Sequence, residues 1–428
     1  MMKKYKLGDL LEVMRGASLS GEYYSTEGKY VRLTCGNFDY VNNCFKDNTS
    51  KDNLYYIGKV RDEFIMKKGD IITPLTEQAI GLLGSTAIIP ESDKYIQSQD
   101  VAKIICNEEL LYPMYAFYLI SSDLVKKQLG AAAQQTKIRH TSPDKIKDCI
   151  VWIPELPEQK RIATILSNLD RKIALNRQIN ANLEALARQL YDYWFVQFDF
   201  PNGNGEPYKS SGGKLVYNPI LKREIPDGWE VKNLDECIEH INTGLNPRKN
   251  FVFGGDIRYI TVKNLTEEGY IDFAGCDFIN EEARNKVNRR SQIEVGDILY
   301  ASICPLGRTH LITSEPKDWD INESVFSIRP NKKVITSEYL NMLFKDAYYI
   351  QKLTQSSAGS IFQGIRIGEL EQTKILVPKH NILELFSQRV CATIQMQSVN
   401  NEEIALITRQ RNELLPLLMN GQIPLRNQ

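Results

Sequence analysis

Asp144, Glu158 and Lys160 are residues whose types and order match a known catalytic arrangement. Pro-Asp followed by Glu-x-Lys is the loose pattern of metal-dependent nucleases, in which two carboxylates share a divalent ion near the scissile phosphate. That chemistry needs Glu158 and Lys160 on a strand, where residues two apart share one face. Here they open a predicted helix, where they do not, and the pattern does not recur in the second half of the chain. A nuclease is therefore an alternative hypothesis.

Other catalytic signatures are missing from the sequence. Gly212-Gly213-Lys214 lacks the Ser/Thr and the upstream glycine of a phosphate-binding loop, and no Asn-Pro-Pro-aromatic motif of amino-methyltransferases occurs. The eight cysteines form no Cys-x-x-Cys and the four histidines are scattered, so we expect no zinc site of ordinary spacing. Reduced thiols in a cytoplasmic protein are the simplest interpretation. We predict no catalytic residue and no metal ligand.

Basic residues concentrate between Lys126 and Lys147, where six of them accompany a single acid. The formal net charge of the whole chain is zero, so any affinity for a polyanion has to be local. Within this stretch, residues 130–140 are rich in Gly, Ala and Gln, and residues 356–366 are their counterpart in the second half. Small residues allow close backbone approach, and Gln, Lys and Arg carry donors and acceptors for base edges and phosphates.

These two stretches and their surroundings supply the candidate DNA-binding residues. The candidates are Gln134, Gln135, Lys137, Arg139, Lys263, Asn264, Arg308, Ser360, Gln363 and Arg366. Two more basic clusters are Arg284, Lys286, Arg289 and Arg290, and Arg248, Lys249, Arg258 and Lys263. A solvated surface explains any single cluster, so the hypothesis rests on the occurrence of equivalent loops in both halves.

The chain is an internal repeat. Gly69-Asp70 reappears as Gly296-Asp297, and the pattern Leu33-Thr34-x-x-Asn37 reappears as Ile260-Thr261-x-x-Asn264, both 227 residues later. Ile153-Pro154 reappears as Val377-Pro378 after 224 residues. An ordered set of matches at nearly constant offset indicates a duplication.

Each copy combines a globular part with a long helix. The globular parts contain short apolar runs broken by Gly, Pro and Asn, which predict strands, so each is an α+β domain. After each of them an apolar seam steps by four and three residues, as in a coiled coil. The offset of 224 is a multiple of seven, so Asn176 and Asn400 occupy the same heptad position, where a buried Asn can fix register. We expect Pro416 to end or kink the second helix near its last turn.

The length and the composition of the chain indicate a protein of several globular domains. The 428 residues suggest two to four domains, and 42% hydrophobic with 25% charged residues are ordinary globular values. No apolar run reaches the ~20 residues of a spanning helix, and the lysine-rich N-terminus is followed by no apolar segment of a signal peptide. Gly, Pro and Ser are frequent in residues 197–228, which predicts an exposed connection.

In its order of motifs the sequence resembles the DNA-specificity subunit of type I restriction-modification systems. The resemblance rests on the repeat, the Gly-Asp-Ile strands at Gly69 and Gly296, the helix opening Leu156-Pro157-Glu158-Gln159-Lys160, and the runs 179–195 and 414–423. It covers nearly the whole chain. The Leu-Pro-x-Gln opening is missing from the second copy, so the sequence does not fix where the second helix starts.

The resemblance implies an α+β fold with two target-recognition domains and two long helices that form an antiparallel coiled coil with pseudo-twofold symmetry. The predicted boundaries are domain one at 1–153, the central helix at 154–196, the connection at 197–228, domain two at 229–378 and the C-terminal helix at 379–428. It implies a non-catalytic reader of a bipartite duplex DNA site, which seats two methyltransferase subunits and motor-nuclease subunits. S-adenosylmethionine, ATP and Mg²⁺ would belong to those partners. Besides the nuclease, a coiled-coil scaffold that binds only protein is the other alternative.

Overall fold

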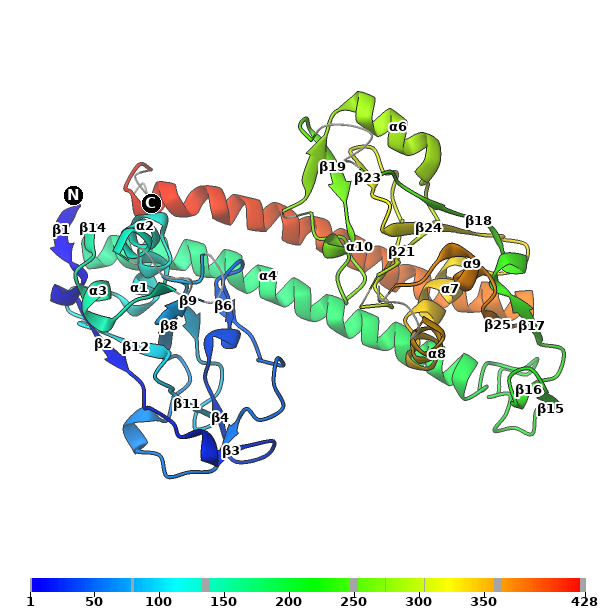
Figure 1. Cartoon of the computed structure of the whole chain (residues 1–428), viewed down its shortest axis with the longest axis horizontal. Helices are drawn as coiled ribbons and strands as arrows, with labels where there is room; N and C mark the ends of the chain where they lie inside the picture. The colour runs from blue at the N-terminus through cyan, green and yellow to red at the C-terminus, as the bar shows by residue number, and fades with distance from the viewer. Residues whose placement is uncertain are drawn as a thin grey trace. The chain divides into compact units, whose positions relative to one another are not determined.

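The computed structural model describes residues 2–77, 81–132, 139–246, 253–273, 275–303, 305–357 and 364–423. The chain divides into two compact units, one of Met1–Ile173 with Leu406–Gln428 and one of Ala174–Ala405. Two long helices, α4 (Leu156–Tyr191) and α10 (His380–Met419), contribute to both units (Figure 1).

The first unit is built on two four-stranded sheets. One has the order β10-β8-β12-β2, and the other has the order β11-β4-β7-β3, in which β4 and β11 are parallel. Short antiparallel pairs β1-β14, β9-β13 and β5-β6 complete it. The strands are β1 Lys3–Lys6, β2 Leu11–Arg15, β3 Tyr24–Ser25, β4 Tyr30–Arg32, β5 Phe38–Asp39, β6 Cys44–Phe45, β7 Tyr55–Tyr56, β8 Ile71–Pro74, β9 Thr76–Glu77, β10 Ala87–Ile88, β11 Tyr95–Ile96, β12 Val101–Cys106, β13 Arg139–His140 and β14 Ile150–Ile153.

The second unit repeats this topology. Its sheets have the orders β22-β21-β24-β18 and β20-β19-β23, with β19 and β23 parallel, and β17 pairs with β25 as β1 pairs with β14. The strands are β17 Glu230–Asn233, β18 Ile238–Thr243, β19 Ile257–Ile260, β20 Asp277–Ile279, β21 Ile298–Ala301, β22 Thr309–Leu311, β23 Trp319–Ile321, β24 Val325–Pro330 and β25 Lys374–Val377. The predicted duplication of an α+β domain is therefore confirmed.

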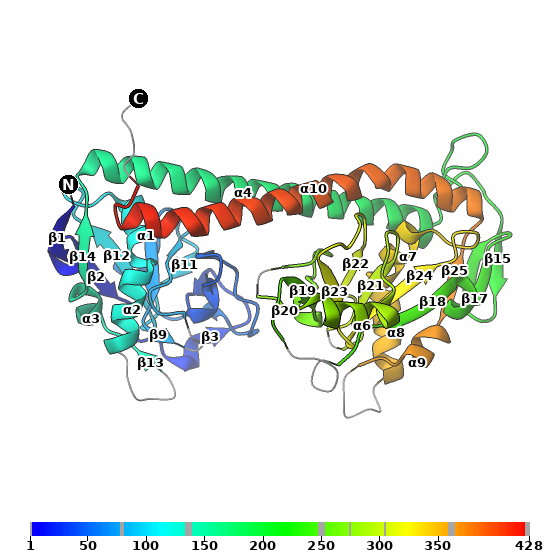
Figure 2. The same ribbon diagram turned by 90° about the horizontal axis from the view of Figure 1, so that it is seen from above.

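Helices recur in the same places. In the first unit α1 (Pro113–Ile120) lies near β12, α2 (Asp123–Ala132) near β14 and α3 (Pro143–Lys147) near β2 (Figure 2). Their counterparts in the second unit are α7 (Ser337–Phe344), α8 (Ala347–Ser357) and α9 (Ile367–Glu371). The helix α6 (Glu281–Ser291) has no counterpart among the described helices of the first unit.

The repeated Gly-Asp motif forms the same turn twice, and each time its Asp pairs with a basic residue of a neighbouring strand. Gly69 and Gly296 have φ values of +93° and +96°, a conformation that glycine adopts without steric cost. Asp70 accepts from Lys103 Nζ at 2.7 Å. Asp297 accepts from Arg329 Nε at 2.8 Å. Each pair links the turn to the central strand of its sheet, so the motif is structural.

The long helices carry the predicted seams. Every described seam position is buried or half-buried, from Ile162 to Trp194 on the first helix and from Phe386 to Leu418 on the second. Within the first unit, Ile162 and Leu166 of α4 join Leu418 of α10 in one apolar cluster. A π-helical turn, Asp192–Val196, extends α4.

A polar layer joins the helices within the second unit. Asn176 donates to Glu403 Oε2 at 2.7 Å, Asn180 to Asn401 Oδ1 at 2.8 Å, and Asn400 to Asn180 Oδ1 at 2.9 Å. Partners on α10 descend in number as those on α4 ascend, so the pairing is antiparallel. Because one residue of slippage would break these bonds, the layer specifies register.

Helix α10 ends at Met419, three residues after Pro416, so Pro416 lies in the last turn of the helix, where the sequence predicts its end. Gly421, at φ +65°, provides the left-handed stop. The expectation about the connection needs correction. The connection is not simply exposed: Phe198 and Phe200 are only 5% exposed each and pack on Trp229. A hairpin of β15 (Leu215–Asn218) and β16 (Arg223–Pro226) follows.

Candidate nucleic-acid interface

The two candidate loops are held by the same elements. In the first unit α2 precedes the loop and β13 follows it, and β13 pairs antiparallel with β9 through Arg139–Glu77 and His140–Thr76. In the second unit α8 precedes the loop and an antiparallel bridge between Ile303 and Gly364 closes it. The shared anchoring means that the two segments are structural equivalents.

Half of the candidate residues lie outside the described part of the chain. These are Gln134, Gln135, Lys137, Ser360 and Gln363, and for Arg139 only the backbone is described. Arg366 is exposed, and its backbone forms the N-cap of α9, where its N–H donates to Glu369 Oε2 at 3.0 Å. A contact of these residues with DNA stays a prediction.

Polar residues that the sequence did not single out anchor the first loop. Thr76 Oγ1 lies 3.3 Å from His140 Nδ1 and 3.2 Å from Asp100 Oδ1. Glu77 is only 7% exposed, and its Oε1 accepts from the Gly81 N–H at 2.8 Å. Thr76 and Glu77 belong to no sequence motif, so the sequence alone does not indicate this role. The pairing of β9 with β13 shows that they lie beside the candidate loop.

Lys263 and Asn264 are adjacent but differ in their surroundings. Lys263 is exposed on a 3-10 turn, Val262–Asn264. Asn264 is 5% exposed; its side chain accepts from the Thr261 N–H at 2.9 Å and donates to Asp272 O at 3.0 Å. The equivalent Asn37 makes the same two kinds of bond, to Thr34 and Lys46. This placement gives Asn264 a structural role, and its predicted DNA contact would require the turn to open.

The remaining basic residues divide into paired and exposed groups. Arg308 pairs with Glu267 at 3.1 Å, Arg258 with Asp318, and Lys286 with Glu282 at 2.8 Å. Arg289 and Arg290, in the last turn of α6, are exposed. In the first unit, burial lowers the pKa of Lys126, whereas Lys127 is exposed. The exposed cations are the ones available for phosphate contacts.

The nuclease hypothesis has no structural support. Asp144 pairs with Lys147 at 3.4 Å on α3, and Glu158 pairs with Arg161 at 3.6 Å in the first turn of α4. Lys160 lies over the ring of Tyr112. Within the described ranges, no three His, Cys, Asp or Glu side chains are grouped to hold a metal ion. Glu158 and Lys160 are thus on a helix, as the sequence predicts.

The described cysteines are all free thiols. Burial raises the pKa of Cys35, Cys149, Cys237 and Cys276 to about 11, so these thiols are poor nucleophiles. No described helix combines the length and the apolar character that a bilayer-spanning segment needs.

Comparison with known proteins identifies the family. The model of the type I restriction modification DNA specificity domain matches residues 1–185 and 226–416. The chain belongs to this family. The two matches coincide with the two structural repeats, and the prediction of a non-catalytic DNA-specificity subunit is confirmed.

Curated members of the family are similar along most of the chain. The MjaIX specificity subunit of a type I restriction enzyme from Methanocaldococcus jannaschii is 27% identical over 316 residues, which cover 72% of this chain and 68% of the relative. The HindI specificity subunit from Haemophilus influenzae is 23% identical over 410 residues, with coverage of 84% and 87%.

A solved structure shares the fold. The S subunit of a type I restriction-modification system from M. genitalium superposes with a TM-score of 0.58 at 16% identity, covering 100% of this chain and 97% of the other. The predicted fold of two repeated domains with two long helices is therefore confirmed.

Proposed function

We propose that each repeated domain binds one half of a bipartite duplex DNA target and that the antiparallel helix pair sets the gap between the halves. The observation that carries the proposal is the twofold occurrence of one domain with equivalently anchored basic or polar loops. Helix α4 alone has 36 residues, or about 54 Å at ~1.5 Å per residue. Half-sites one turn apart are separated by ~34 Å, which a rod of this length can span.

The partners in this proposal are two methyltransferase subunits and motor-nuclease subunits. Leu175 and Val399 support two equivalent docking positions: they are 224 residues apart, beside Asn176 and Asn400, and 57% and 64% exposed. Two equivalent exposed apolar positions suit two copies of one partner. We assign S-adenosylmethionine, ATP and Mg²⁺ to these partners, and the assembly to the cytoplasm.

Selection from random duplexes tests the proposal. The chain, reconstituted with its methyltransferase subunits, is incubated with a pool of random double-stranded DNA, and bound molecules are sequenced over several rounds. We expect enrichment of two short motifs separated by a gap of fixed length. Arg366→Ala should weaken selection in one half only, while Arg389→Ala, at an exposed position on α10, should alter neither. Enrichment of a single uninterrupted motif, or of none, would overturn the proposal.

A further inference from the structure

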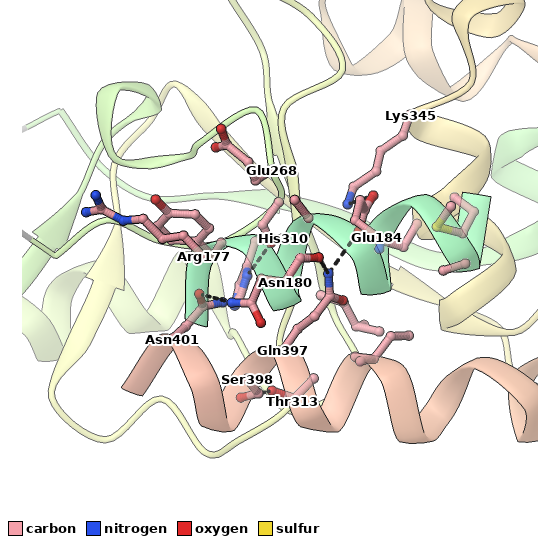
Figure 3. Close-up of a pocket in the computed structure, with 18 of the residues that line it drawn as sticks. Arg177, Asn180, Glu184, Glu268, His310, Thr313, Lys345, Gln397, Ser398 and Asn401 are labelled. Atoms are coloured by element: carbon pink, nitrogen blue, oxygen red, sulfur yellow. Dashed lines mark hydrogen bonds and ion pairs between the residues drawn. The ribbon is translucent and has the colours of Figure 1, made fainter. Parts of the chain in front are cut away.

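The second unit contains a cavity of about 430 Å³. Residues of α4, of α10 and of the second globular domain line it. Figure 3 shows Asn180, Glu184, His310 and Lys345 around it. A volume of this size is in the range of small-molecule sites. All of its lining residues belong to the second unit.

The repeat shows what fills the corresponding space in the first unit. There Arg411 of α10, 8% exposed, donates to Asp170 of α4 and to the Asn42 carbonyl, both at 3.0 Å. Tyr118 of α1 donates to the other oxygen of Asp170 at 2.6 Å. Four polar partners thus connect the helix pair to the domain.

Three of these residues are replaced in the second unit by a residue that lacks a polar side chain. At the offset of 224, Arg411, Asp170 and Tyr118 correspond to Ala187, Ile394 and Met342. All three replacements line the cavity. The cavity therefore lies where the first copy has the Arg411–Asp170–Tyr118 group of hydrogen bonds.

Polar groups remain at the cavity wall. His310 Nδ1 donates to the Gly269 carbonyl at 3.0 Å, and because burial lowers the pKa of His310 to about 4, its other ring nitrogen is an acceptor at neutral pH. Lys345 Nζ donates to Glu184 Oε1 at 2.8 Å. It also lies close to Gly269, where an added Cβ would be only 2.4 Å from the nitrogen. An ammonium group has three donors, so Lys345 can serve a ligand as well.

The charges of the lining select the kind of ligand. The cavity is lined by two basic residues, Arg177 and Lys345, and two acidic ones, Glu184 and Glu268. A balanced set gives a charged ligand no net attraction to offset its desolvation. The amides of Asn180, Gln397 and Asn401 both donate and accept, and Ala181, Met342 and Ile394 add apolar surface.

The geometry points to a binding site for an uncharged heterocycle with both donors and acceptors, of the nucleoside class, in the cavity formed by α4, α10 and the second domain. This site is separate from the loops proposed to bind DNA, so its failure would leave that proposal intact. A bound ligand would add a connection between the second domain and the helix pair beside the Lys345–Glu184 ion pair.

Methyl NMR tests the site on the full chain. With ¹³C-labelled methionine methyls, adenosine, cytidine, guanosine and uridine are titrated separately. Met342 lines the cavity, whereas Met396 is 53% exposed on α10 and does not. We expect at least one nucleoside to shift the Met342 signal saturably and to leave Met396 unchanged. Absence of a shift at Met342 with all four, or shifts of both methyls alike, would overturn the inference.

A matched pair of substitutions locates the binding. Ala181→Phe is expected to place a ring in the cavity, and Ala185→Phe places the same ring one turn away; both positions are exposed, but only Ala181 belongs to the lining. Ala181→Phe should weaken nucleoside binding roughly tenfold or more, and Ala185→Phe should leave it unchanged. Equal affinity in both variants would overturn the location. If Ala181→Phe does not fold, the methyl shifts of the unmodified chain decide alone. Inorganic phosphate and arginine serve as charged probes; preferential binding of either would also contradict the uncharged class.

Discussion

Arg411 Nη1 lies 3.0 Å from Asp170 Oδ1, so an ion pair joins the two long helices within the first unit. The side chain of Arg411 is 9% exposed and that of Asp170 is 30% exposed. Removal of one partner from a pair this deeply placed leaves the other charge without compensation. We therefore expect the pair to contribute to the stability of the first unit.

Arg411→Met is expected to lower the free energy of unfolding by about 1–3 kcal/mol. The methionine keeps most of the buried apolar stem, but Asp170 Oδ1 and the Asn42 carbonyl lose the hydrogen bonds from Arg411, and Tyr118 remains as a donor to Asp170 Oδ2. Urea denaturation of the full chain measures the effect, with Arg409→Met, at an exposed position on the same helix, as control. Equal stability of both variants would show that the ion pair is not important.

Substitution of Lys263 is expected to affect DNA binding, whereas substitution of the adjacent Asn264 is expected to affect stability. Asn264→Ala removes bonds to Thr261 and Asp272 and should cost about 1–3 kcal/mol of stability. Lys263→Ala should leave stability unchanged and reduce the salt dependence of DNA binding, because one phosphate contact contributes ~0.9 to the slope of log K against log salt. Denaturation and salt titrations of the complex provide the two readouts. An unchanged salt slope for Lys263→Ala would remove it from the interface.

The candidate loops are expected to act on separate half-sites. Lys137→Ala and Arg139→Ala should weaken binding to the first half-site, and Gln363→Ala and Arg366→Ala should weaken binding to the second. We expect each substitution that removes a hydrogen bond to a base to cost ~1–3 kcal/mol of binding free energy. Binding of the complex to duplexes that carry substitutions in one half measures this effect. Unchanged affinity in all four variants would show that other segments read the bases.

Asp320 predicts a dependence of stability on pH. Burial raises the pKa of its carboxyl group from 3.8 to about 6, against hydrogen bonds from Ser291, Asn288 and the Ile321 N–H. The folded chain thus binds this proton more tightly than the unfolded chain does. The protonated carboxyl group therefore contributes on the order of 2–3 kcal/mol to the free energy of unfolding. This contribution is fully present below pH 4 and is lost as the pH rises to about 6.

Comparison with Asp320→Asn isolates that contribution. The stability of the variant relative to the unmodified chain should rise between pH 4 and pH 6 and stay level above pH 6, because the amide does not titrate. Urea denaturation at several pH values measures the difference. A difference that is constant across this range would show that the folded carboxyl titrates normally.

The sequence predicts those features that repeat or that have a period. The offsets of 227 and 224 reveal the duplicated topology, and heptad spacing places Asn176 and Asn400 in the seam. Features that depend on three-dimensional contact are not visible in it. Arg411 looks like a polar interruption of the seam until Asp170 and Asn42 are seen beside it. Asn264 looks like a base-reading amide until its turn is seen.

Seven residues inserted into α4 between Ile173 and Ala174 test whether the helices set the gap between half-sites. One heptad preserves the phase of the seam but lengthens α4 by about 10 Å while α10 keeps its length. We expect the assembled complex to select a different gap, or assembly to fail because the Asn176–Glu403 layer loses its register. As control, the same insertion after Gly203, in an exposed turn of the connection, should leave the gap unchanged. An assembled complex whose gap is unaltered by the α4 insertion would show that the helix pair does not determine the spacing.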